Sequence, residues 1–192
     1  GHPYTALRCT ETTKYLVSEM SARSIGNIAH LAAIAPPHIG VVLNVGTAHM
    51  GEFGSRDNIA RAKGELVEAL PADGIAVLNA DDDYVAAMAD RTSATVWSFS
   101  TLHKPVWVAA TDIRLDNLSR PTFTLIGTDS QKVTHTAQVT LQIFGEHQVA
   151  NALAAATAAL AAGVDFATVA QGLRAHTVRS AHRMDVHHAG ND

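Results

Sequence analysis

Within the first hundred residues of the chain, a short apolar run is followed by a helical pattern three times. The apolar runs span residues 15–20, 39–45 and 75–79, and the helical patterns span residues 26–35, 55–70 and 83–90. A fourth apolar run follows at residues 95–99. Strands that are apolar on both faces and alternate with helices are typical of a parallel sheet with right-handed crossovers. We therefore predict an α/β fold with a doubly wound, mostly parallel sheet flanked by helices.

The pattern changes at about residue 106. Residues 106–143 contain β-rich segments separated by turn residues, with no helical pattern between them, which predicts a small antiparallel β subdomain. Helical patterns return at residues 147–162 and 165–175, and residues 183–188 suit one more strand. Because no linker composition separates these parts, we expect a single domain that carries the β subdomain.

Composition excludes several classes of protein. The 192 residues are 47% hydrophobic and 17% charged, and the formal net charge of −4 leaves no basic stripe for nucleic acid. Cys9 is the only cysteine, which favours a reducing compartment, and no apolar run is long enough to span a membrane. The histidines show no helical metal-binding spacing. We expect a monomeric cytoplasmic protein.

Two predicted strands end in polar residues. Glu19 closes the first, and the second ends at Asn44, followed by a loop that contains His49. Each residue alone is more typical of a solvent-exposed surface. Ligands of α/β sheets bind beyond the carboxyl ends of the strands, however, and adjacent strand ends would bring Glu19 and His49 together. This shared location favours a ligand site with the segment from Asn44 to Glu65 as one wall.

Lys63 lies on the apolar face of its predicted helix. At about 100° per residue, Ile59, Ala62 and Leu66 define that face, and Lys63 falls within it. A buried ammonium is disfavoured, so such a lysine must reach water, find a carboxylate, lose its proton or be modified. The neighbouring Gly64 is unfavourable in a helix interior, which suggests a close approach to the backbone. A lysine that packs only its stem on the core is an equally good interpretation.

A third polar site is predicted at the start of the alanine-rich helix at 147–162. His147 and Asn151 are four residues apart and share a face, whereas Val149, Leu153 and Leu160 lie on the opposite, core-facing side. By pattern alone, an ordinary solvated helix start is the better interpretation.

Taken together, these segments resemble the central ATP-binding domain of the Mur ligases of peptidoglycan synthesis, most closely the members that add D-alanyl-D-alanine. The resemblance extends over nearly the whole chain. It is carried by SEMSARSIGNIAHLA, IAPPHIGVVLNVGTAHMGEFGS, IARAKGEL, LPADGIAVLNADD, FGEHQVANALAA and SAHRM. It implies an ATP-dependent amide ligase that joins D-alanyl-D-alanine to a UDP-N-acetylmuramoyl tripeptide through an acyl phosphate.

The resemblance also implies roles for individual residues. Glu19 and His49 match Mg²⁺ ligands of the family, and Lys63 matches a lysine that carries a carbamate and adds a further carboxylate for the metal ions. His147 and Asn151 match residues of the adenine pocket, and Arg183 matches an arginine near the ATP phosphates. We expect Lys63, Asn44 and Arg183 to take part in catalysis.

The sequence departs from the family at several points. Ser21 and Asn27 stand where glycine and glutamate are common, and no Gly-Lys-Ser or Gly-Lys-Thr phosphate loop occurs. We therefore expect residues 1–192 to be a partial domain that lacks the phosphate loop, the N-terminal UDP-sugar domain and the C-terminal domain, and to be inactive by itself.

Two alternatives stay open. One is another Mur ligase or a folylpolyglutamate synthase-like ligase, which shares the ATP chemistry but has a different acceptor. The other is a non-catalytic nucleotide-binding module that has kept the fold and lost its phosphate loop.

Overall fold

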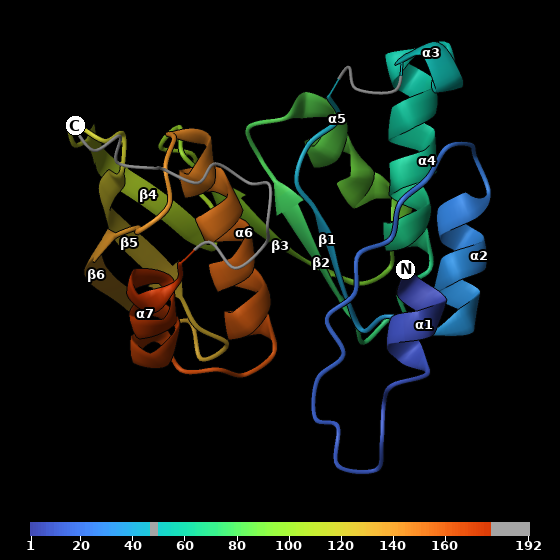
Figure 1. The fold of residues 1–192 in the computed structure, drawn as a ribbon, viewed down its shortest axis with the longest axis horizontal. Helices are drawn as coiled ribbons and strands as arrows, with labels where there is room; N and C mark the ends of the chain where they lie inside the picture. The colour runs from blue at the N-terminus through green and yellow to red at the C-terminus, as the bar shows by residue number, and fades with distance from the viewer. Residues whose placement is uncertain (47–49, 178–192) are drawn as a thin grey trace, which may run out of the picture. The chain divides into compact units, whose positions relative to one another are not determined.

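The computed structural model describes residues 1–46 and 50–177 of the chain, without the side chains of Met50 and Glu52. It divides into two compact units, Gly1–Phe99 and Ser100–Asp192 (Figure 1). Each unit is described by itself below.

The first unit contains three parallel strands. The order β1-β2-β3 follows the order along the chain, and Ile39 pairs with Ile75, which in turn pairs with Thr95. The elements of this unit are α1 (His2–Ala6), α2 (Asn27–Ile34), β1 (Ile39–Val42), α3 (Met50–Phe53), α4 (Arg56–Glu68), β2 (Ile75–Asn79), α5 (Asp83–Ala86), the 3-10 helix η1 (Ala87–Arg91) and β3 (Thr95–Ser100).

The core of this unit lies between its strands and helices. Ala76, Val77 and Leu78 are all buried, because side chains on both faces of β2 are covered. Helix α4 lies against β1 and buries Ala62 and Val67 completely. Ser55 caps α4 by accepting a hydrogen bond from the Asn58 amide.

One predicted strand of this unit is wrong. Residues 15–20 run without regular secondary structure, and Tyr15 and Val17 are 66% and 91% exposed. An apolar pattern supplies the side chains of a strand, but its hydrogen bonds must come from a neighbouring strand. The remaining strands and helices predicted for this unit are confirmed, with ends that differ by up to three residues, except that the helix expected at 83–90 consists of α5 followed by the 3-10 helix η1.

The second unit contains an antiparallel sheet, as predicted for residues 106–143. Its strands are β4 (Val108–Leu115), β5 (Pro121–Thr128) and β6 (Thr134–Thr140), with β5 in the middle. Alternate residues of β5 are buried, which is typical of a sheet with one covered face. The register of β4 shifts between Thr111 and Arg114, where Asp112 has a positive φ of 54°.

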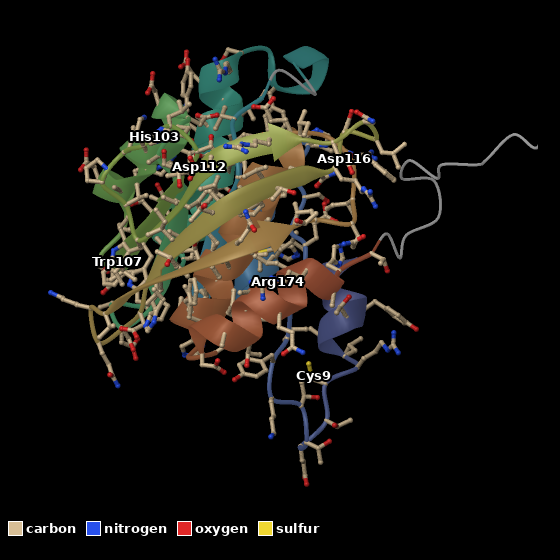
Figure 2. The ribbon with its side chains drawn as sticks, turned by 90° about the vertical axis from the view of Figure 1, so that its left-hand side faces the viewer. Cys9, His103, Trp107, Asp112, Asp116 and Arg174 are labelled. Atoms are coloured by element: carbon tan, nitrogen blue, oxygen red, sulfur yellow. The ribbon has the colours of Figure 1, made fainter. Side chains whose placement is uncertain are left out.

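Two helices pack against this sheet. Helix α6 (His147–Ala161) contacts β4 and β5, and α7 (Phe166–Ala175) contacts α6 and β6. Arg174 on α7 lies beside the strands and donates two hydrogen bonds to the Gln138 carbonyl of β6 (Figure 2). The predicted helices are confirmed. The strand expected at residues 183–188 lies outside the described residues.

The predicted fold class is confirmed, with parallel strands and intervening helices first and antiparallel strands after them. Within the described ranges, no helix has the length and hydropathy needed to cross a membrane.

Candidate active site

Lys63 lies on the inward face of α4, as the helical periodicity predicted, and its amine reaches the segment that follows β1. Its side chain is half-buried beside the buried Ile59 and Ala62, and its Nζ donates a hydrogen bond of 2.6 Å to the main-chain carbonyl of Asn44. Burial lowers the pKa of the Lys63 amine, and the carboxylate of Asp82 partly opposes this shift. The structure therefore brings together Lys63 and Asn44, two of the residues expected to take part in catalysis.

The residues on either side of Asn44 are held by other side chains. Asn79 Nδ2 donates to the Leu43 carbonyl at 2.9 Å, and Asp82 Oδ2 accepts from the Val45 amide at 2.8 Å. Arg56 Nε donates to the Val45 carbonyl, also at 2.8 Å. Main-chain groups of three consecutive residues after β1 thus bind side chains from α4, from the end of β2 and from the start of α5.

Gly64 is approached closely, as its position in a helix interior suggested, and the approaching group is the guanidinium of Arg91. A Cβ added to Gly64 would lie 1.9 Å from Arg91 Nη1. The guanidinium donates to the carbonyls of Ala60 and Arg61 and to the Glu68 carboxylate, at 3.0, 2.9 and 2.9 Å. The glycine therefore leaves room for an arginine that binds α4 from η1.

Glu65 caps a helix other than its own. Its carboxylate is buried and accepts hydrogen bonds from the amides of Gly26 and Ala29 at the start of α2. Gly26 has no side chain to cap α2, so the carboxylate takes that place and also opposes the positive end of the helix dipole. Glu65 thereby fixes α2 to α4, the helix that carries Lys63.

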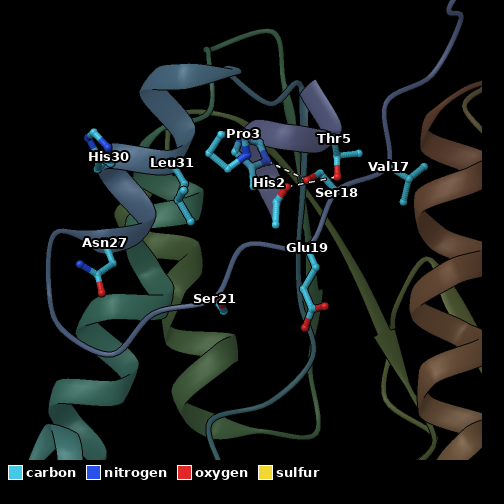
Figure 3. A pocket seen from close by; sticks show the side chains of 11 residues that line it. His2, Pro3, Thr5, Val17, Ser18, Glu19, Ser21, Asn27, His30 and Leu31 are labelled. Carbon is cyan, nitrogen blue, oxygen red and sulfur yellow. Dashed lines mark hydrogen bonds between the residues drawn. The ribbon is translucent and has the colours of Figure 1, made fainter. Parts of the chain in front are cut away.

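Glu19 lines an open cavity of about 580 Å³ in the first unit. Its carboxylate is exposed and points away from the hydrogen bond between His2 Nδ1 and Ser18 Oγ, which are 2.7 Å apart (Figure 3). The cavity is also lined by Ser21, Asn27, His30 and Leu31. This solvent-exposed carboxylate at the cavity is therefore available to a ligand.

Asn27 closes the turn into α2. Its side-chain oxygen accepts from the amides of Arg23 and Ser24 at 3.0 and 3.1 Å. An uncharged side chain therefore performs a local structural task at this position.

Two of the expected site residues, His49 and Arg183, lie outside the described residues. The expected contact between Glu19 and His49 is therefore untested. Among residues 1–46 and 50–177, no three His, Cys, Asp or Glu side chains gather closely enough to hold a metal ion.

The second expected binding region, at the start of α6, has the predicted orientation. His147 and Asn151 are exposed, whereas Val149 and Leu153 are fully buried. Gln148 connects the two polar residues, because its side chain lies 3.1 Å from His147 Nε2 and accepts from Asn151 Nδ2 at 3.0 Å. The polar residues therefore form one continuous exposed face of α6, and the buried apolar residues lie on the opposite face.

His147 also lines an open cavity of about 330 Å³ within the second unit. Its ring packs over Gly145, where an added Cβ would lie 2.6 Å from His147 Cε1. The other lining residues are Thr101, Ile113, Glu146, Val149 and Ala150. The lining thus combines polar and apolar side chains and includes His147, but Asn151 does not line this cavity.

Sequence reasoning missed four residues that organise the first site: Arg56, Glu65, Asn79 and Asp82. A signal for two of them was present, because Asn79 closes β2 and Asp82 follows it closely, which makes this a polar strand end like the one at Asn44. Nothing in the local pattern identified Glu65 as the cap of another helix.

Comparison with known proteins places these features in one family. Residues 1–159 match the family described as Mur ligase middle domain. The chain is 54% identical over 187 residues to UDP-N-acetylmuramoyl-tripeptide--D-alanyl-D-alanine ligase of Mycobacterium tuberculosis, a match that covers 97% of this chain and 35% of that protein. The chain thus spans about a third of the length of such curated relatives.

Solved structures agree with this match. The crystal structure of MurF from Acinetobacter baumannii superposes with a TM-score of 0.87 at 33% identity, covering 98% of this chain and 40% of that one. MurF ligase from Thermotoga maritima in complex with ADP superposes with a TM-score of 0.66 at 28% identity, covering 79% of this chain and 34% of that one. The chain belongs to the Mur ligase middle domain family.

Proposed function

We propose that this chain is the ATP-binding middle part of an amide ligase that joins D-alanyl-D-alanine to a UDP-N-acetylmuramoyl tripeptide in peptidoglycan synthesis. The names of its relatives support this assignment, since relatives that are 54% and 36% identical are both UDP-N-acetylmuramoyl-tripeptide--D-alanyl-D-alanine ligases. The MurF structure with ADP supports a nucleotide as one substrate. The parent protein acts in the cytoplasm as a monomer.

The observation that carries the proposal is the setting of Lys63. A half-buried lysine with a lowered pKa and its Nζ beside the Asn44 carbonyl is suited to become a carbamate. The neutral amine attacks CO₂, a nitrogen–carbon bond forms, and one proton leaves the nitrogen for solvent. The product carries one negative charge and two carboxylate oxygens.

The donor chemistry of Glu19 and of a carbamate on Lys63 suits a divalent cation. Mg²⁺ prefers oxygen ligands, and the exposed Glu19 carboxylate and a carbamate on Lys63 supply them. We assign His49 as a further ligand. When bound, Mg²⁺ neutralises the phosphate charge of ATP.

The reaction that we propose transfers a phosphoryl group and then an acyl group. The tripeptide carboxylate attacks the γ-phosphorus of ATP, the bond to ADP breaks, and an acyl phosphate forms. The amine of D-alanyl-D-alanine then attacks the acyl carbon, and the tetrahedral intermediate releases phosphate and a proton. Such chemistry depends on positioning and on fixed charge more than on a covalent nucleophile.

The remaining site residues hold the nucleotide in this proposal. His147 and Asn151 bind the adenine at the polar face of α6, and Arg183 binds the phosphates. Asn44 contributes through the strand end that orients Lys63.

The test is a ligation assay of the full-length protein with ATP, a UDP-muramoyl tripeptide and a series of amine acceptors. We expect ADP release and an amide product with D-alanyl-D-alanine, and neither with diaminopimelate, lysine or glutamate. An amide product with one of those other acceptors would favour another ligase of the superfamily. Failure to consume ATP with any acceptor would favour a non-catalytic nucleotide-binding module. Residues 1–192 alone should form no product.

A further inference from the structure

The position of the Lys63 amine depends on a main-chain segment that has no regular secondary structure. Residues 43–46 follow β1 and belong to no helix or strand. The Lys63 amine donates to Asn44, the second residue of this segment. Whatever fixes the segment therefore also fixes the amine.

Asp82 connects residues 43–46 to the junction between β2 and α5. Its Oδ2 accepts from the Val45 amide at 2.8 Å, and its Oδ1 accepts from the Val85 amide at 3.1 Å. The second bond makes Asp82 the N-cap of α5. Its side chain is only 12% exposed, so both bonds are largely shielded from water.

Arg56 binds the carbonyl of Val45, whereas Asp82 binds its amide. Its Nε donates to the Val45 carbonyl at 2.8 Å, and its Nη2 lies 3.9 Å from Asp82 Oδ2. The guanidinium carbon also lies 4.8 Å from the centroid of the Tyr84 ring, as in a cation–π contact. Arg56 is thus oriented by three groups around it.

We propose that Asp82 is a positioning residue for Lys63, a role that rests on the proposed function of the site. Asp82 and Arg56 hold the amide and the carbonyl of Val45, and Asn79 holds the Leu43 carbonyl. The Asn44 carbonyl lies between these fixed points and directs the lysine. Without Asp82, the segment loses the only one of these bonds that fixes a main-chain amide.

A purely structural role for Asp82, as the cap of α5, makes a different prediction. Loss of the cap would lower stability and leave the geometry at Asn44 unchanged. Asp165 is a matched control because it caps α7 in the second unit, where it accepts from the amide and the hydroxyl of Thr168 at 2.9 and 2.6 Å. Asp165 lies in the unit that does not contain Lys63.

The experiment compares Asp82→Ala, Asp82→Asn and Asp165→Ala in the full-length protein. For Asp82→Ala we expect kcat to fall by about 10- to 100-fold, with KM values for ATP and dipeptide within about threefold of wild type. Asp82→Asn keeps one oxygen that can accept from Val45 and should recover part of the rate. Asp165→Ala should retain wild-type kcat. A normal kcat in Asp82→Ala, or a loss matched by Asp165→Ala, would overturn the proposal.

Amide hydrogen exchange at Val45 provides a readout that does not require ligase activity. We expect exchange at this amide to become at least about tenfold faster in Asp82→Ala and to stay unchanged in Asp165→Ala. If the wild-type protein fails to ligate any acceptor, the proposed function is wrong, and the exchange result still decides the positioning role. Unchanged exchange at Val45 in Asp82→Ala would show that Asp82 does not hold the segment.

Discussion

The two polar regions of the chain differ in how far along the sequence their contacts reach. After β1, the main-chain groups of Asn44 and Val45 bind side chains that are 11, 19 and 37 residues away. At the start of α6, polar side chains bind each other over separations of one and three residues. The first region is fixed only when its unit has folded, whereas the second is organised by one helix.

This difference suggests a division of tasks. Long-range bonds from several elements hold a reactive group in one geometry, which phosphoryl and acyl transfer require. A locally organised helix face leaves its polar groups free to contact a ligand. We therefore expect substitutions in the first region to change the rate of the reaction, and substitutions in the second to change the affinity for nucleotide.

The largest effect is expected for Lys63→Ala in the full-length protein. Loss of the amine removes the proposed carbamate, so phosphate release should fall by at least about a thousandfold. Short-chain carboxylic acids should restore part of the rate because they can supply a carboxylate in the same space. The measurement is steady-state phosphate release with and without added acid.

Lys14→Ala is the control for Lys63→Ala, because Lys14 is exposed and lies far from α4 in the sequence. It should retain the wild-type rate. Near-normal turnover in Lys63→Ala would remove the lysine from the mechanism and would leave the strand end as a structural feature.

Asn151→Ala tests the second region. If this side chain contacts the adenine, the KM for ATP should rise about tenfold, a loss of about 1.4 kcal/mol, while the KM for D-alanyl-D-alanine stays nearly constant. Gln148→Ala is the matched control, because it removes the bond between Gln148 and Asn151 and keeps Asn151 itself. Equal changes in both KM values would indicate a structural helix start.

Gly64→Ala tests how far the first region depends on a distant partner. The new methyl group would displace the Arg91 guanidinium, whose hydrogen bonds are each worth about 1 kcal/mol, whereas the helix gains about 1 kcal/mol from alanine. Loss of the three bonds to Ala60, Arg61 and Glu68 would cost about 3 kcal/mol and the alanine offsets about 1 kcal/mol, so we expect the free energy of unfolding to fall by about 2 kcal/mol. In an Arg91→Ala background the same substitution should raise it by about 1 kcal/mol, as measured by urea unfolding.

Gly145→Ala provides the contrast in the second region. Gly145 has a positive φ of 101°, so alanine is strained there even if the neighbouring side chain is removed. His147→Ala should therefore not reverse the sign of the Gly145→Ala effect.

For Gly64→Ala, a destabilising effect both with Arg91 and in the Arg91→Ala background would argue against the close contact between Gly64 and the Arg91 guanidinium.

The smallest effect concerns the protonation of Lys63. Burial disfavours the charged amine, so at a given pH more of it is neutral than in a lysine with the ordinary pKa of 10.5. Trace acetylation of Lys63, followed by mass spectrometry, should therefore rise at a lower pH than that of Nα-acetyl-lysine. Because the Asp82 carboxylate raises the pKa, Asp82→Asn should move the labelling curve to still lower pH. A Lys63 curve at or above that of the reference compound would contradict this prediction.

Helical periodicity predicted one part of the first site. It placed Lys63 on an inward face, and the cost of glycine in a helix indicated a close approach at Gly64. It did not identify Arg91 as the approaching group, because that residue lies 27 positions later and on another element. Roles proposed from the family resemblance for Glu19, His147 and Asn151 stay predictions.

The sequence by itself determined the α/β class, the positions of most helices and strands, and the buried faces of the helices predicted at 55–70 and 147–162, because these depend on local periodicity. Only the tertiary structure decided that residues 15–20 are not a strand, since a strand needs a neighbour for its hydrogen bonds. It also decided that Glu65 caps α2 and that Asp82 holds Val45. Such contacts join residues more than thirty positions apart, and no local pattern specifies which distant partner a polar side chain will meet.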